Sequence, residues 1–226
     1  MAKVSVQEKM QSENERVAAA NRAAFAKAGV LVLNLVSSPG SGKTTLLEGT
    51  LDRLPAAGLR ALVIEGDVCT ARDLDRVKAR GGSGVQINTG GGCHLSAQMV
   101  SDVLGRLDLA SADVVFIENV GNLICPSTYD LGEDAKVVLL ATAEGDDKPM
   151  KYPTIFHESA LAVLNKTDLI PYIPYDIGKV EKEIAVLNPR CEILRVSALK
   201  GDGMDGWVSW IAARLTAKRL GAKRAG

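Results

Sequence analysis

The first segment of the sequence that could perform chemistry is SSPGSGKTT, residues 37–45, which follows an apolar run. Small residues there let backbone N–H groups curl around phosphate oxygens at the start of a helix. In that pattern Lys43 supplies positive charge to the outer phosphates, and the Thr44 hydroxyl ligates Mg²⁺. Ser37 stands where the pattern usually has glycine. The residues predicted to bind a nucleoside triphosphate here are Gly40, Ser41, Gly42, Lys43, Thr44 and Thr45.

A second segment, NKTD, begins at Asn165 and indicates which base the nucleotide carries. The carboxylate of Asp168 can accept two N–H bonds from the edge of guanine, which adenine does not offer, and such a site discriminates strongly. We expect Asn165 to help hold the base and Lys166 to lie along its ring. Backbone amides expected near the base oxygen follow the last apolar run, at Ser197, Ala198 and Leu199. Together with the phosphate loop, NKTD predicts a GTP site.

Two acidic residues are predicted to complete the phosphate side of this site. Glu118 begins ENVG, where GTPases usually carry Asp-x-x-Gly, and Gly121 can present its N–H to the terminal phosphate. Asp67 is expected to reach Mg²⁺ directly or through water, and the alternative is that Asp67 caps a helix. The predicted catalytic residues are therefore Lys43, Thr44, Asp67 and Glu118, and the last three are the predicted magnesium ligands. Catalysis would rest on positioning and charge stabilisation.

Two cysteines and a histidine form a candidate transition-metal site. Cys93 and His94 adjoin in TGGGCHLSAQ, and Cys125 lies in GNLICPSTYD. Two thiolates and an imidazole are a soft ligand set that suits Zn²⁺ or Ni²⁺. A structural zinc normally has four protein ligands, so a set of three favours metal transfer. Because free cysteines are often buried, packing is the alternative. Packing or surface roles are expected for Cys69, Cys191 and His157.

An α/β fold must position these segments. Seven short apolar runs indicate buried strands, at residues 30–36, 59–64, 85–88, 113–119, 136–143, 160–166 and 191–197. Helical patterns separate most of them, which predicts a mostly parallel sheet with helices on both faces, as in P-loop NTPases. Ligands of such sheets bind at the carboxyl ends of the strands. Residues 1–29 are predicted to form a helical N-terminal extension, and residues 30–226 the P-loop domain.

The composition limits the class of protein further. A hydrophobic content of 46% and a charged content of 24% over 226 residues are typical of a soluble globular protein. The formal net charge is zero, which gives no indication of a nucleic-acid partner. The sequence shows neither an apolar signal region nor a run of about 18 apolar residues, so we expect a cytoplasmic protein without membrane insertion. Cytoplasmic thiols are kept reduced, which disfavours disulfides.

Several segments resemble the nickel-insertion GTPases of NiFe-hydrogenase maturation. The matching motifs are NLVSSPGSGKTTLL, EGDVCTARDLDR, TGGGCHLSAQMV, FIENVGNLICPSTYDLGE and LNKTDLIPY. The leading ENERVAAANRAAFAKAGV resembles the first helix of that family, so the resemblance covers almost the whole chain. Two departures are visible. Residues 1–29 contain neither the cysteine-rich motif nor the histidine-rich tract of many relatives, and Ser38 replaces a lysine common in the dimerising class.

The resemblance implies a GTPase of the dimerising, signal-recognition-like class, which uses GTP, GDP and Mg²⁺. It also implies a nickel or zinc site at Cys93, His94 and Cys125, at a homodimer interface and responsive to nucleotide. The implied partners are a small zinc-containing maturation protein and the hydrogenase large-subunit precursor. GTP hydrolysis coupled to nickel delivery is thus the expected function. The alternatives are a urease-type nickel-insertion GTPase, a small-molecule P-loop kinase, against which NKTD argues, and a metal-buffering protein with vestigial GTPase activity.

Overall fold

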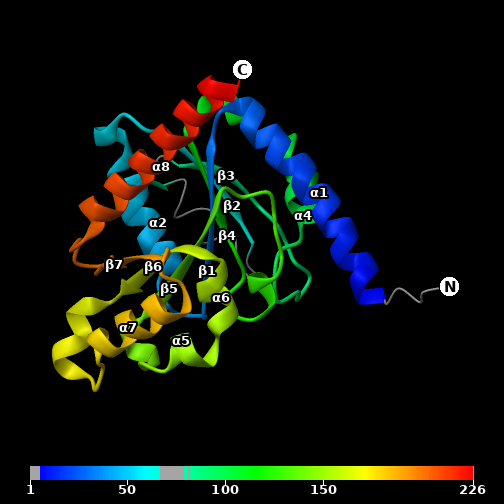
Figure 1. The fold of residues 1–226 in the computed structure, drawn as a ribbon. Coiled ribbons are helices and arrows are strands. Elements are labelled where there is room, and N and C mark those ends of the chain that lie inside the picture. The colour runs from blue at the N-terminus through cyan, green and yellow to red at the C-terminus, as the bar shows by residue number, and fades with distance from the viewer. Residues whose placement is uncertain (1–5, 67–78, 81, 226) are drawn as a thin grey trace.

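A computed structural model describes residues 6–66, 79–80 and 82–225 of the chain. Within these ranges seven parallel strands form one sheet, in the order β3-β2-β4-β1-β5-β6-β7 (Figure 1). Each of the seven apolar runs overlaps one strand, so the predicted parallel sheet is confirmed. The strands are β1 (Leu31–Ser37), β2 (Ala61–Glu65), β3 (Ser83–Gln86), β4 (Val114–Glu118), β5 (Ala135–Ala141), β6 (Ser159–Asn165) and β7 (Glu192–Arg195).

Helices cover both faces of the sheet (Figure 1). One face packs against α2 (Lys43–Leu51) and α8 (Met204–Ala225). Among the described residues, the helices on the other face are α1 (Val6–Ala28), α4 (Ala97–Leu104), α6 (Pro153–Glu158) and α7 (Ile177–Leu187). The short α5 (Lys148–Lys151) precedes α6. Short 3₁₀ helices lie in the described connections, at η1 (Leu54–Ala57), η2 (Leu109–Ser111), η3 (Cys125–Ser127), η4 (Thr142–Glu144) and η5 (Thr167–Tyr172).

The central strand β4 shows why the sequence builds this layered core. Its five residues are all buried, and successive side chains of a strand point to opposite faces. Val114 and Phe116 belong to the cluster with α2 and α8, where the Phe116 ring lies 6.4 Å from the Trp207 ring. Val115 and Ile117 belong to the cluster with α1 and α4. A strand that is apolar throughout therefore packs against helices on both sides.

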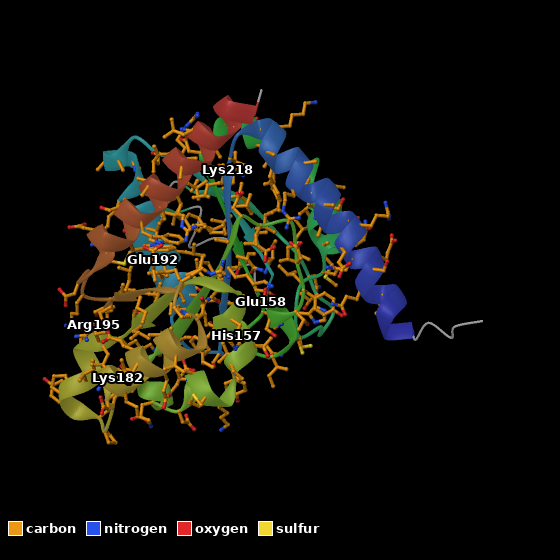
Figure 2. All side chains as sticks on the ribbon, in the orientation of Figure 1. His157, Glu158, Lys182, Glu192, Arg195 and Lys218 are labelled. Atoms are coloured by element: carbon orange, nitrogen blue, oxygen red, sulfur yellow. The ribbon has the colours of Figure 1, made fainter. Side chains whose placement is uncertain are left out.

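Side-chain hydrogen bonds attach the two terminal helices to the rest of the domain. Asn21 on α1 donates to the backbone oxygens of Ala97, at 2.8 Å, and Leu131, at 3.1 Å. Lys218 on α8, labelled in Figure 2, donates to the backbone oxygen of Val30 at 2.6 Å. The predicted N-terminal helix is thus present and packs along α4. Among the described helices, none is both long and apolar enough to cross a membrane.

The parallel register gathers the strand ends at one edge of the sheet. Leu35 of β1 pairs with Glu118 at the end of β4, and Ala141 of β5 pairs with Asn165 at the end of β6. Ser37 is the last residue of β1, which lies between β4 and β5 in the sheet. The loops that leave the sheet here carry the candidate nucleotide and metal residues.

Candidate nucleotide and metal site

The loop after β1 has the shape of a phosphate cradle. Gly40 and Gly42 have φ angles of 77° and 96°, and Gly42 is the residue before the first turn of α2. Positive φ is favourable for glycine and strained for residues with a Cβ atom. A Cβ at Gly42 would also lie 2.7 Å from Nδ2 of Asn165. Glycine at this position therefore meets two requirements, a left-handed turn and close approach of the neighbouring loop.

Ser37, the departure from the usual pattern, contacts the phosphate-loop lysine. The buried Lys43 donates a hydrogen bond from Nζ to the Ser37 hydroxyl at 2.8 Å. The hydroxyl itself donates to the backbone oxygen of Ser38 at 2.8 Å. A glycine at position 37 could not accept from the lysine through a side chain. The serine thus holds the ammonium group beside the loop that would receive phosphate.

Thr44 and Glu118 meet across the cleft between α2 and the end of β4. The Thr44 hydroxyl donates to the Glu118 carboxylate at 3.1 Å, and Glu118 is 4% exposed. Hydroxyl and carboxylate oxygens are ligands that suit Mg²⁺. These residues border a cavity of about 570 Å³, which we call the phosphate cavity. Its lining includes Gly40, Gly42, Lys43, Thr44, Glu118 and Gly121. The remaining predicted magnesium ligand, Asp67, lies outside the described residues.

Asn165 joins the phosphate loop to the loop after β7. Its side-chain NH₂ donates to the backbone oxygen of Ser41 at 2.8 Å, and its side-chain oxygen accepts from the Ala198 N–H at 3.1 Å. Lys166 follows in a left-handed conformation, with φ of 62°, and its Nζ donates to the backbone oxygen of Gly40 at 2.7 Å. Three segments that are distant in sequence are therefore connected around one cleft.

Asp168 lies at a second cavity, of about 290 Å³, beside the first. The Ser197 hydroxyl donates to the Asp168 carboxylate at 2.6 Å and so orients it. The cavity is lined in part by Asn165, Lys166, Asp168, Ser197, Ala198 and Leu199. Thr45 borders both cavities, whereas Ser41 is buried and is not among the lining residues of either cavity. The arrangement matches a nucleotide with its phosphates at the first cavity and its base at the second.

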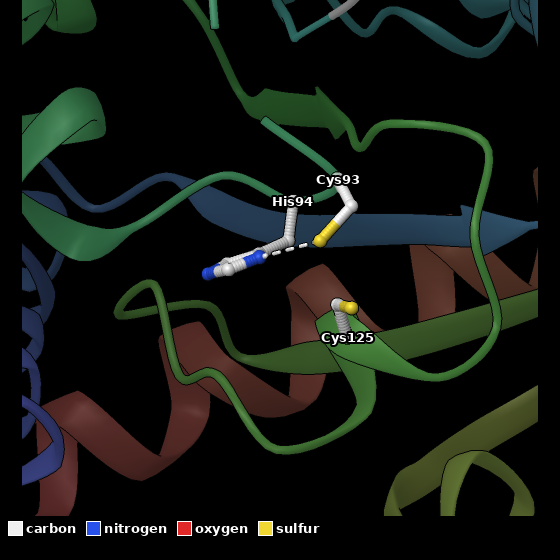
Figure 3. Close-up of side chains that lie close together, drawn as sticks. All are labelled: Cys93, His94 and Cys125. Atoms are coloured by element: carbon white, nitrogen blue, oxygen red, sulfur yellow. Dashed lines mark hydrogen bonds between the residues drawn. The ribbon is translucent and has the colours of Figure 1, made fainter. Parts of the chain in front are cut away.

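Cys93, His94 and Cys125 come together near the same edge of the sheet (Figure 3), and we call these three residues the metal-ligand cluster. The two sulfur atoms and one ring nitrogen lie within 4.8 Å of one another, and Cys93 Sγ is 3.4 Å from His94 Nδ1. Bond lengths of about 2.0 to 2.3 Å place the ligand atoms of a tetrahedral site about 3.3 to 3.8 Å apart. Small side-chain movements would therefore close the set around one metal ion. Cys93 is exposed, which leaves the cluster accessible from the surface.

The loops that carry these ligands have local structural causes. Gly90 and Gly91 have φ angles of 61° and 91°, and turn the chain after β3. Ser96 then caps α4 by accepting the Met99 N–H at 3.3 Å. Cys125 begins η3, whose second residue is Pro126. The glycine turn and the start of α4 therefore flank Cys93 and His94, and a 3₁₀ turn positions Cys125.

The protonation of the cluster affects metal binding in two opposite ways. Burial lowers the pKa of His94, so its imidazole is neutral at physiological pH and has a lone pair for a metal. A hydrogen bond with Cys125, together with burial, raises the pKa of the Cys93 thiol. A bound metal must displace that proton, because the thiolate is the ligand. The His94 ring also lies 3.9 Å from the Tyr129 ring, a contact that the sequence did not indicate.

The other candidates lie away from this cluster or outside the described residues. His157 is exposed near the end of α6 (Figure 2), as expected for a surface histidine. Cys191 is buried in the cluster with α6 and α7, and burial raises its pKa to about 11. Cys69 lies outside the described residues. Cys191 and His157, which were expected to have packing or surface roles, are thus not part of the metal-ligand cluster.

The fold and its loops define a P-loop nucleotide-binding protein with a thiol–imidazole cluster beside the phosphate cavity. The chain belongs to the CobW/HypB/UreG family, whose nucleotide-binding domain model matches residues 31–195.

Characterised relatives place the chain more closely within that family. It is 51% identical over 199 residues to the hydrogenase maturation factor HypB of Escherichia coli strain K12, which covers 88% of the chain and 68% of that protein. It is 40% identical over 212 residues to the hydrogenase/urease maturation factor HypB of Helicobacter pylori strain 26695, covering 92% of the chain and 86% of that protein.

Solved structures agree with this placement. HypB of Helicobacter pylori in complex with nickel matches with a TM-score of 0.87 and 36% identity, over 91% of this chain and 96% of that one. The maturation factor HypB of Archaeoglobus fulgidus matches with a TM-score of 0.84 and 36% identity, over 90% of this chain and 99% of that one. The receptor FtsY of Elizabethkingia anophelis, with a TM-score of 0.54 and 16% identity, shares the fold alone.

Replacing Gly121 by alanine is expected to weaken nucleotide binding about tenfold or more. A Cβ at Gly121 would lie 3.0 Å from Cα and 3.1 Å from the backbone nitrogen of Pro39, so the phosphate loop would have to move. Gly105→Ala is the matched control, because a Cβ there has no atom within 4 Å and the φ of Gly105 is −66°. Titration with a fluorescent nucleotide measures both. Equal nucleotide affinity of the Gly121→Ala variant and the wild type would contradict the prediction that Gly121 borders the bound phosphates.

Proposed function

We propose that this protein is a GTP-hydrolysing metallochaperone, which binds nickel or zinc and assists nickel insertion into the large-subunit precursor of a NiFe hydrogenase. One observation carries the proposal. The segment that begins at the end of β4 contributes Glu118 and Gly121 to the phosphate cavity and then Cys125 to the metal-ligand cluster. A single short segment therefore serves both sites, which is the arrangement a nucleotide-controlled metal carrier needs.

Guanine is the base we propose for the second cavity. Asp168 is held by Ser197, and a carboxylate can accept from both the ring N–H and the amino group of guanine. The Asn165 contacts with the flanking loops support a site that fits one base closely. Adenine offers no such pair of donors, and leaving buried polar groups unpaired is unfavourable.

Hydrolysis would proceed by positioning and charge stabilisation. Lys43 would move from Ser37 to the outer phosphates, and Thr44 and Glu118, together with Asp67, would hold Mg²⁺. When bound, that ion would neutralise charge that develops on the phosphates. The N–H of Gly121, which also lines the cavity, would meet the terminal phosphate. These residues would together orient the phosphate chain and stabilise its charge during attack by water.

Nickel would be the cargo, bound by Cys93, His94 and Cys125. The open coordination position that three ligands leave would admit a ligand from a partner, which suits metal transfer. We propose a homodimer that is dependent on GTP, metal or both, with a small zinc-containing maturation protein as metal partner and the hydrogenase precursor as recipient. These steps would take place in the cytoplasm.

A second candidate is delivery of nickel to urease. The Helicobacter pylori relative is named a hydrogenase/urease maturation factor, which supports this alternative. Deletion of the gene, followed by assays of both nickel enzymes, separates the two candidates. Loss of hydrogenase activity alone would support the leading proposal, and loss of urease activity alone would support the second.

The nickel affinity is expected to depend on the bound nucleotide. We would titrate metal-free protein with nickel, once with GDP and once with a non-hydrolysable GTP analogue. Coupling between two sites is typically worth about 5- to 150-fold in affinity. A several-fold difference would support delivery by a nucleotide switch. Equal affinity in both states would contradict that role and favour passive buffering, and the Lys43→Ala variant shows whether any difference requires correct phosphate binding.

A further inference from the structure

Asn119 is hydrogen-bonded both to a residue that lines the phosphate cavity and to a residue that adjoins the metal-ligand cluster. Its side chain is buried, and its oxygen accepts two backbone N–H bonds, from Val120 at 2.9 Å and from Leu95 at 3.1 Å. Val120 borders the phosphate cavity, and Leu95 directly follows His94 in the chain. One amide oxygen therefore holds a backbone group from each site.

The Leu95 contact would restrict the backbone from which His94 projects. Leu95 is fully buried, and its side chain packs against Gly66, where an added Cβ would lie 2.5 Å from Leu95 Cγ. The side chain and the N–H of Leu95 are thus both fixed. A displacement of either Asn119 or Leu95 would change the direction in which the His94 ring points.

A second branch of the same polar network reaches the turn that carries Cys125. The Asn119 side-chain NH₂ donates to the Asn34 side-chain oxygen at 3.2 Å, and Asn34 donates to the Glu133 carboxylate at 3.1 Å. Lys136 lies 3.9 Å from that carboxylate and donates to the backbone oxygen of Ser127 at 2.9 Å. Ser127 ends the turn that Cys125 begins. The network therefore contacts both metal-binding loops.

We propose that Asn119 is a positioning residue that couples nucleotide state to the geometry of the metal ligands, an inference that rests on the proposed function. A phosphate that draws the Gly121 N–H toward itself shifts the adjoining Val120, which shares its acceptor with Leu95. Because buried hydrogen-bond networks have few alternative arrangements, such a shift changes the Leu95 contact. Asn119 contacts neither metal nor nucleotide in this role. It acts through Leu95 and Val120.

The test compares nickel affinities in the GDP and GTP-analogue states of two variants. Asn119→Ala removes the shared acceptor. Asn188→Ala is the matched control, because Asn188 is also a buried asparagine and its side chain bonds backbone groups at Phe156, Ser159 and Arg190. We expect the nucleotide-dependent ratio of nickel affinities to fall to within about twofold of unity in Asn119→Ala. The Asn188→Ala variant should retain the wild-type ratio.

The outcomes separate this inference from the proposed function. A wild-type ratio several-fold from unity that persists in Asn119→Ala would overturn the role of Asn119 and leave the proposed function in place. A wild-type ratio of unity would overturn both. Reciprocity provides a check, because nickel must change the affinity for the GTP analogue by the same factor as the analogue changes the affinity for nickel.

A measurement on the unmodified protein covers the case in which Asn119→Ala does not fold. Hydrogen exchange of the Leu95 amide would be followed in metal-free protein with GDP and with the GTP analogue. We expect a change of at least about fivefold between the two states. The Arg190 N–H, which donates to the Asn188 side chain at 3.0 Å, is the matched control and should not change. Unchanged exchange at Leu95 would overturn the proposal.

Discussion

Replacing Cys125 by alanine is expected to lower nickel affinity by about a hundredfold or more and to abolish stoichiometric binding at micromolar metal. The reason is the size of the ligand set. Among the residues that the structure describes, only three such ligand atoms lie within 4.8 Å of one another, so losing one sulfur leaves Cys93 and His94. Isothermal titration of metal-free protein with Ni²⁺ measures the change. Nucleotide affinity should persist, because Cys125 does not border the phosphate cavity.

The control for this experiment is another cysteine of the same chain. Cys191→Ala removes a thiol that is buried between α6 and α7, away from the cluster. We expect that variant to bind nickel as tightly as the wild type. Retention of one tightly bound nickel in Cys125→Ala would show that the three-ligand assignment is wrong. Loss of nickel from both variants would indicate general misfolding, which circular dichroism would detect.

Replacing Asp168 by asparagine is expected to weaken GTP binding by about a thousandfold or more. A site built to bond particular polar groups can discriminate by about 10⁴- to 10⁵-fold, and the asparagine NH₂ would face guanine donors instead of accepting from them. Xanthine carries an oxygen where guanine has its amino group, so Asp168→Asn should gain affinity for xanthosine triphosphate. Competition among the three triphosphates of guanosine, adenosine and xanthosine measures the preference.

A second acidic residue provides the matched control for Asp168. Asp176 caps α7 by accepting the Lys179 N–H at 2.9 Å, and asparagine is an equally good cap. Asp176→Asn should therefore leave GTP binding unchanged. If Asp168→Asn binds GTP within about threefold of the wild type, then the base does not contact Asp168. That outcome would also revive the small-molecule kinase as an alternative, since a kinase needs no guanine preference.

The strands could be predicted because each is a compact apolar run. The interior strands β4 and β6 have almost entirely buried residues, and their predicted limits are close to the observed ones. The edge strand β3 was placed at residues 85–88 but spans Ser83–Gln86. Its first residue is exposed and the other three are half-buried, so pairing with β2 and not apolar content decides where it begins. Register of that kind depends on a neighbour distant in the sequence.

The candidate site was only partly visible in the sequence. The phosphate loop and NKTD carry their chemistry in short motifs, so their residues could be named without a structure. Asn34 instead interrupts one apolar run and Lys136 begins another, and their partners come from other segments. The Tyr129 contact with His94 likewise joins two loops. Residues that act by holding a distant backbone group leave no local pattern.

Asn165 has a consequence for how quickly and tightly a nucleotide binds. Because its side chain already joins Ser41 to Ala198, the loops after β1 and β7 have their relative positions before any ligand arrives. Ordering loops upon association is unfavourable, and each immobilised side chain costs about 0.5 to 1.5 kcal/mol. A preorganised cleft avoids much of that entropy loss, so base and phosphate contacts contribute more fully to affinity. An incoming nucleotide would then meet loops after β1 and β7 that already have their positions, and conformational adjustment would be confined to the segment after β4 and the metal-binding loops.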